Sequence, residues 1–101
     1  MKLLQIDFPI DGPFGIEMTE AFSDLAKDIA TEDGLIWKIW TENKEAKEAG
    51  GIYLFQDIEN ANRYLEKHTK RLNSFGIDNI TSKIFDVNVP LSQIDKADFL
   101  K

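Results

Sequence analysis

The stretch "YLEKHTKRL", residues 64–72, contains the chain's one histidine, His68. A histidine changes its charge near neutral pH, so it can act as a base, a hydrogen-bond donor or a ligand. The residues around it are mostly charged, as on the exposed surface of a helix. Whether His68 can do chemistry therefore depends on the direction in which its side chain points.

A helix predicted over residues 58–75 and ended by Gly76 gives that direction. At about 100° per residue, the apolar residues of this segment fall within an arc of roughly 140°, with His68 near its middle. The members of the arc are Ile58, Ala61, Tyr64, Leu65, His68, Leu72 and Phe75. The other side of the helix is polar. His68 is therefore predicted to face the protein interior, where a structural core histidine is the alternative to a functional one.

Four residues are candidate substrate contacts around His68. Tyr64 lies one helical turn before it, and Arg71 flanks the apolar arc, where it could attract an anionic substrate or simply face solvent. Phe22 belongs to the apolar stripe of an earlier helix. Side chains of a strand alternate, so the wholly apolar set containing Trp37 in "LIWKIWTEN" is expected to face the helices and to lie near His68.

The elements that must position these residues follow in the order β-α-β-β-α-β. Strands are predicted over residues 2–9, 35–43, 52–57 and 80–87, and helices over residues 17–30 and 58–75. This order is that of the ferredoxin-like α+β fold, a four-stranded antiparallel sheet with two helices on one face. Both helices share a face because each has one apolar stripe to bury. We expect residues 1–101 to form a single domain of this kind.

The connections carry further expectations. Gly34 is predicted to end the first helix, and residues 44–51, with two glycines, to form a long connection between strands. After Pro90, Ser92 is predicted to cap a short final helix.

The composition limits the kinds of partner. A net charge of -6 disfavours nucleic acid and acidic membrane surfaces, which require a surplus of Lys and Arg. No stretch approaches the roughly 18 to 20 apolar residues that cross a bilayer, and the first residues lack a secretory cleavage site. Without cysteine there is no disulfide or thiolate nucleophile. We expect a cytoplasmic protein whose partner is a small molecule or another protein chain.

The open face of the predicted sheet is expected to be partly apolar. Leu3, Ile36 and Trp40 are predicted there among polar residues, and one side of "GIYLF", residues 51–55, adds two more apolar side chains. Such a face is best explained by a partner that covers it, most simply a second copy of the chain. We therefore predict a homodimer with its sheets packed face to face, on which the apolar residues after Pro90 dock.

Five stretches in order along nearly the whole chain resemble the YdhR-type mono-oxygenases. They are "DGPFG" (11–15), "LIWKIWTEN" (35–43), "EAGGIYLF" (48–55), "YLEKHTKRL" (64–72) and "KIFDVNVPLSQI" (83–94). That family is similar in fold to the dimeric α+β barrel proteins, in which two ferredoxin-like subunits join their sheets. The same superfamily includes cofactor-independent quinol mono-oxygenases, haem-degrading enzymes and small isomerases.

The resemblance implies a mono-oxygenase that uses dioxygen on a small aromatic substrate, a phenol or quinol, in a pocket between helices and sheet. The chain has no dinucleotide fingerprint or P-loop, and one histidine does not make the two-histidine site of non-haem iron. No cofactor is therefore expected. His68 is the candidate catalytic base, and the indole N–H of Trp37 or the hydroxyl of Tyr64 is a candidate donor to the developing oxyanion.

Two alternatives stay open. The first is a haem-binding or haem-degrading protein with His68 as an axial iron ligand and Trp37 against the porphyrin. The second is a non-catalytic dimer that binds a small molecule.

Overall fold

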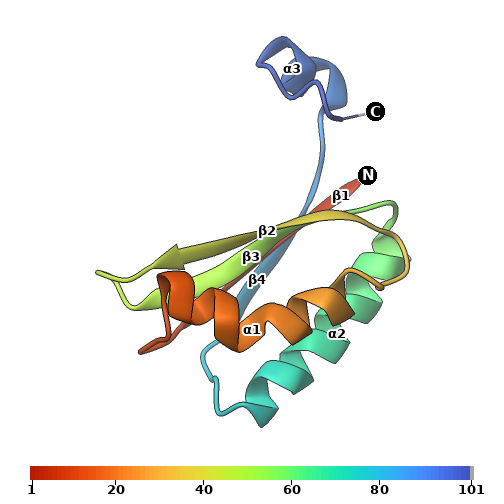
Figure 1. Cartoon of the computed structure of the whole chain (residues 1–101). Helices are drawn as coiled ribbons and strands as arrows, with labels where there is room; N and C mark the ends of the chain where they lie inside the picture. The colour runs from red at the N-terminus through yellow and green to blue at the C-terminus, as the bar shows by residue number, and fades with distance from the viewer. Residues whose placement is uncertain (101) are drawn as a thin grey trace.

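The chain forms a two-layer α+β structure, described for residues 1–100 in a computed structural model (Figure 1). Helices α1 and α2 lie side by side against one face of a sheet, and α3 stands apart from both layers. The elements are β1 (Lys2–Pro9), α1 (Gly15–Ile29), β2 (Leu35–Asn43), β3 (Glu48–Phe55), α2 (Ile58–Ser74), β4 (Thr81–Asp86) and α3 (Val89–Ile94). The predicted order of elements is confirmed.

The sheet has the strand order β2-β3-β1-β4, and every neighbouring pair is antiparallel. In the register of the sheet, Leu4 of β1 lies opposite Tyr53 of β3 and Ile84 of β4. Leu4 and Tyr53 are almost fully buried in the core between the sheet and α2. The core therefore lies on the face that the helices cover, as the single apolar stripe of each helix requires.

The helix ends follow local chemistry. At the start of α2, the Asp57 side chain accepts a hydrogen bond of 2.8 Å from the backbone N–H of Asn60. The helix ends at Ser74, and Gly76 follows with φ +83°, as predicted. Helix α1, in contrast, ends at Ile29. Gly34, with φ +78°, belongs to the turn that leads into β2, so the prediction that it ends the helix is wrong.

The two glycines before residue 52 lie in β3, not in a long connection. The turn between β2 and β3 occupies only residues 44–47. A side chain at Gly50 would collide with the backbone of Ile6 on the neighbouring strand. At Gly51 an added Cβ would lie 2.8 Å from Cε of Lys38. These glycines allow close packing within the sheet, a use of glycine that sequence does not distinguish from a turn.

The facing of β2 is the reverse of the prediction. Lys38 is paired with Tyr53, and Trp37 with Leu54, so Lys38 lies on the helix-covered face and Trp37 on the open face. Trp40 also faces the helices, where its ring stacks on Phe22 of α1. A register shift between Leu35 and Trp37 interrupts the strand pairing at its start. The rule that the wholly apolar set is buried fails here because the other set contains a lysine that is itself partly buried.

Helix α3 begins with Asn88, whose side chain accepts a hydrogen bond of 3.1 Å from the backbone N–H of Leu91. Ser92 lies inside the helix, so its predicted role as the cap is wrong. Beyond α3, Phe99 packs edge-on against Trp37 at 5.8 Å between ring centres. Within residues 1–100, no helix combines the length and the apolar character that crossing a bilayer demands.

Candidate active site

His68 points from α2 toward the sheet and is only 3% exposed. Its ring stacks on Tyr64, one turn earlier, with 5.0 Å between ring centres, and lies edge-on to Tyr53 of β3 at 6.3 Å. The predicted direction of His68 is confirmed, and Tyr64 lies beside it as expected.

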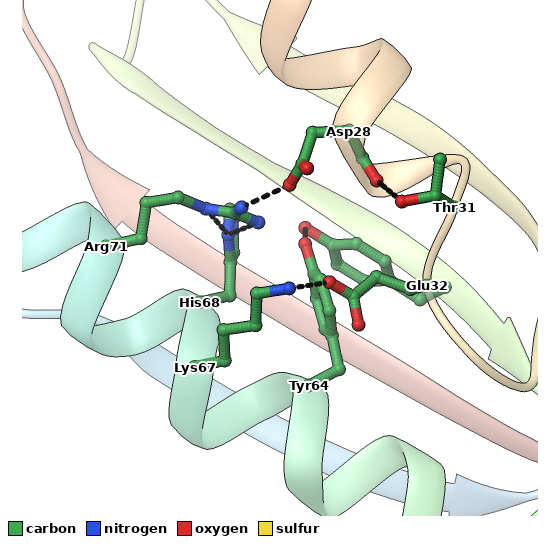
Figure 2. A network of polar contacts seen from close by, with 8 residues as sticks. Asp28, Thr31, Glu32, Tyr64, Lys67, His68 and Arg71 are labelled. Carbon is green, nitrogen blue, oxygen red and sulfur yellow. Dashed lines mark hydrogen bonds and ion pairs between the residues drawn. The ribbon is translucent and has the colours of Figure 1, made fainter.

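Arg71 fixes the protonation of the His68 ring. Its guanidinium lies 3.2 Å (Nε) and 2.9 Å (Nη2) from Nδ1 of His68 (Figure 2). A guanidinium only donates hydrogen bonds, so Nδ1 must be the acceptor and the proton of the neutral ring sits on Nε2. Burial, together with the positive charges of Lys38, Arg71 and Lys67, lowers the pKa of His68 to about 3. At neutral pH the ring is an uncharged Nε2–H donor.

Arg71 is also tied to α1. Its Nη1 lies 2.8 Å from a carboxylate oxygen of Asp28, and one turn away Lys67 pairs with Glu32 (Figure 2). These ion pairs join the end of α1 and the connection after it to the C-terminal half of α2. Because both partners of Arg71 are protein groups, it is neither a solvated surface residue nor a cation held free for substrate.

The two tyrosines beside His68 form a buried pair. The hydroxyl of Tyr64 donates a hydrogen bond of 3.3 Å to the hydroxyl of Tyr53. Burial raises the pKa of Tyr53 to about 12, and burial together with the neighbouring Tyr53 also raises the pKa of Tyr64. Both phenols therefore stay protonated at neutral pH and are poor proton acceptors.

Lys38 is the residue of this site that the sequence pattern missed. Its Nζ lies 3.5 Å from the centre of the Trp40 ring and 4.7 Å from that of Tyr53. Burial, and to a lesser extent the charge of Arg71, lowers the pKa of Lys38 to about 7. The one available signal is a lysine between two tryptophans in an otherwise apolar part of a strand, on the same side as Trp40.

A small cavity lies between these groups, and a larger groove lies next to it. The cavity has a volume of about 30 Å³, enough to hold a water molecule, and His68 and Lys38 both line it. The groove, about 540 Å³, runs between α1 and β2. Met18, Phe22 and Trp40 line both spaces. Phe22 and Trp40 stack with 6.2 Å between ring centres, so this aromatic pair stands between groove and cavity.

The structure thus brings together His68, Tyr64, Arg71 and Phe22 of the predicted site residues, but not Trp37. The indole N–H of Trp37 is buried and has no hydrogen-bond partner among residues 1–100, and it lies on the sheet face away from His68. The prediction that Trp37 lies beside His68 is therefore wrong. Within residues 1–100, no group of three His, Asp or Glu side chains is arranged to hold a metal ion.

Solved structures of oxygenases share this ferredoxin-like α+β fold. One, described as a "putative antibiotic biosynthesis monooxygenase" from Deinococcus radiodurans, aligns with a TM-score of 0.64 and 8% identity over 87% of this chain and 93% of its own. A mutant of SnoaB, a cofactor-independent oxygenase from Streptomyces nogalater, aligns with a TM-score of 0.58 and 13% identity over 86% and 93%. At such identities the likeness shows the fold alone.

Sequence gives the family. Residues 3–98 match the family described as "Putative mono-oxygenase ydhR", and the chain belongs to this family. No curated protein matches the chain.

Proposed function

We propose that the protein is a cofactor-independent mono-oxygenase that places one atom of dioxygen on a small phenolic or quinolic substrate. The observation that carries this proposal is the groove of about 540 Å³ beside a water-sized cavity lined by His68 and Lys38. The groove falls within the roughly 300 to 1,000 Å³ typical of small-molecule sites. The family description supports mono-oxygenation, and the description of SnoaB supports a route without a cofactor.

A phenol with an open ring position can supply all the electrons that this reaction needs. In the conversion of a phenol and dioxygen to a quinone and water, one oxygen atom enters the ring and the other leaves as water. The substrate provides every electron that dioxygen takes up, so no external reductant is required. The protein has to remove the phenolic proton, stabilise the resulting oxyanion and exclude water.

His68 acts in this proposal as the donor to the oxyanion, and not as the base. Arg71 occupies Nδ1, which leaves the Nε2–H of His68 as the group that can donate to a substrate oxygen in the cavity. A fixed donor of this kind costs no reorganisation during the reaction. Arg71 and Tyr64 are positioning residues, because they contact His68 itself.

The body of the substrate lies in the groove, against Phe22 and Trp40. Both side chains line the groove and can supply apolar contact area to an aromatic substrate. The phenolic oxygen then extends into the cavity, whose volume suits one hydroxyl group. The same volume is far too small for a porphyrin, so the structure offers no support for haem at His68.

Oxygen uptake with a panel of phenols and quinols tests the proposal, beside a thermal-shift measurement with the same compounds. Replacing His68 by Phe keeps an aromatic ring against Tyr64 and removes the donor, so kcat should fall by about 10²- to 10³-fold. Lys70→Ala, on the exposed side of α2, is the matched control. A thermal shift without oxygen uptake would favour a binding module, and unchanged turnover in His68→Phe would remove His68 from the mechanism.

We also propose a homodimer formed through the open sheet face. This face exposes Ile39 (52%) and Phe85 (45%), and the protruding α3 exposes Leu91 and Ile94 (Figure 1). Apolar residues gathered in this way favour a partner that covers them. Light scattering should give twice the 11.6 kDa of one chain. Ile39→Glu should produce the monomer, whereas Ile16→Glu, at a still more exposed isoleucine (78%) of α1, should not. A wild-type monomer would contradict the proposal.

A further inference from the structure

The amine of Lys38 is partly buried and, within the described residues 1–100, has no carboxylate partner. Among residues 1–100, no Asp or Glu oxygen lies within 4.0 Å of Nζ, and its close neighbours are the faces of Trp40 and Tyr53. A buried ammonium group without a counter-ion is costly. Loss of the proton from this amine, or binding of an anion next to it, would therefore lower the free energy of the folded protein.

A glycine on the neighbouring strand β3, Gly51, leaves room for the Lys38 side chain on the helix-covered face of the sheet. Gly51 lies next to Trp40 on the neighbouring strand, on the same face as Lys38. A Cβ at Gly51 would lie 2.8 Å from Cε of Lys38 and 3.0 Å from two ring atoms of Tyr53. The glycine therefore leaves the space in which the lysine chain and the tyrosine ring pack closely against the sheet.

The charged groups of the surrounding elements do not neutralise this amine. On α2 the charges that act on Lys38 or on its neighbour His68 are those of the cations Arg71 and Lys67, and the His68 ring is neutral. The carboxylates of Asp28 on α1 and of Glu32 in the connection after it are held by Arg71 and Lys67, respectively. On β2 itself, Glu42 accepts a hydrogen bond of 2.7 Å from the backbone N–H of Gly15. Among the described residues, the cavity is lined by apolar side chains together with Lys38, His68 and Tyr53, and by no acid.

We propose that Lys38 accepts the proton of the phenolic substrate and then holds the phenolate as an ammonium–phenolate pair, which rests on the function proposed above. The O–H bond of the phenol breaks and its electron pair stays on oxygen, while the lone pair of Nζ forms the new N–H bond. The substrate is thus an aromatic compound with an acidic hydroxyl. Nζ of Lys38 and Nε2–H of His68 would both contact the phenolate oxygen, since both residues line the cavity.

Within residues 1–100, no other group that lines the cavity can accept this proton. Arg71 occupies Nδ1 of His68, and the two tyrosines are themselves protonated phenols. A pKa of about 7 leaves much of the Lys38 population as free amine at neutral pH, and this suits a general base.

A chromogenic phenol tests the proposal without requiring turnover. Para-nitrophenol changes its absorption when it ionises, so its spectrum reports whether the bound dye is phenol or phenolate. In slightly acidic buffer, wild-type protein should bind it as phenolate, and the surface variant Lys70→Ala should still do so because the cavity is intact. Lys38→Met, of similar length without the amine, should give no phenolate band, with its fold checked by circular dichroism. A phenolate band in Lys38→Met, or none in the wild type, overturns the proposal.

Steady-state kinetics with a phenol that the enzyme oxidises distinguish the role of Lys38 as a proton acceptor from the effect of its positive charge. Lys38→Met should lower kcat/KM by about 10²- to 10⁴-fold, the usual contribution of general base catalysis. Lys38→Arg keeps a positive charge but cannot take the proton, so the rise of kcat/KM with pH around neutrality should disappear. An unchanged pH profile in Lys38→Arg refutes the role of Lys38. Failure of the wild type to consume oxygen with any phenol would count against the mono-oxygenase function, while the dye experiment still decides the role of Lys38.

Discussion

Replacing Lys38 by Met should stabilise the folded protein below neutral pH, and the gain should shrink as the pH rises. The pKa of Lys38 falls from its ordinary 10.5 to about 7 on folding, mainly through burial. Below about pH 7, the folded chain carries the positive charge of Lys38 in a partly buried position, which lowers its stability. Above about pH 10.5, the amine of Lys38 is neutral in both the folded and the unfolded chain. Between these values the unfolded chain binds more protons, so stability rises with pH.

The size of the effect follows from the same two pKa values. At about 1.4 kcal/mol per pKa unit, the gap between 10.5 and about 7 corresponds to about 5 kcal/mol, or about 3 to 5 once partial exposure of the amine is considered. Lost cation–π contact with Trp40 removes about 1 kcal/mol of the gain, and the flexible Met fills most of the space. Lys38→Met should thus be about 2 to 4 kcal/mol more stable than the wild type near pH 6.

Urea unfolding at constant protein concentration measures this difference. The gain should fall by about 2 kcal/mol between about pH 7 and pH 9, as the wild type recovers stability. With a typical urea m-value, this corresponds to about 1 to 2 M in the unfolding midpoint. Lys83→Met, at an exposed lysine on the other sheet face, is the control for loss of one positive charge. A Lys38→Met gain that is the same at every pH would refute the reasoning.

Three further predictions concern the neighbours of Lys38. In NMR titrations, the ring protons of His68 should show no transition near pH 6.5, because the pKa of His68 lies at about 3. Arg71→Met should move the midpoint of the His68 titration upward, because it removes a cation next to the ring. A wild-type midpoint near pH 6.5 would contradict this prediction. Gly51→Ala should displace Lys38 and flatten the pH dependence of unfolding, at a cost of about 1 to 3 kcal/mol. Tyr64→Phe should cost about 1 kcal/mol in urea unfolding by removing the hydroxyl pair, and a neutral effect would show that pair to contribute nothing.

Much of the fold was predictable because its determinants are local in sequence. The apolar stripe of α2 gave the direction of His68, and the run 35–43 coincides with β2. Features decided by a distant part of the chain were not predictable. Gly50 lies in β3 because the backbone of Ile6 approaches it from the next strand, a contact that the sequence around residue 50 does not reveal. Likewise, Asn88 takes the capping position before α3, where Ser92 was the other suitable residue nearby.

The candidate site was predictable only where polar and apolar residues separate cleanly. On α2 they do, so His68 was placed correctly. On β2 both faces carry large apolar residues, and the deciding difference is the partly buried Lys38, which a count of apolar residues assigns to the solvent side. Because the facing of β2 is the reverse of the prediction, the cavity is lined by Trp40 and by the amine-bearing Lys38, and not by Trp37. This reversed facing also moves the proposed base from an imidazole blocked by Arg71 to Lys38. A buried lysine that breaks the local pattern is itself a sign of function, since folding alone gives no reason to place it there.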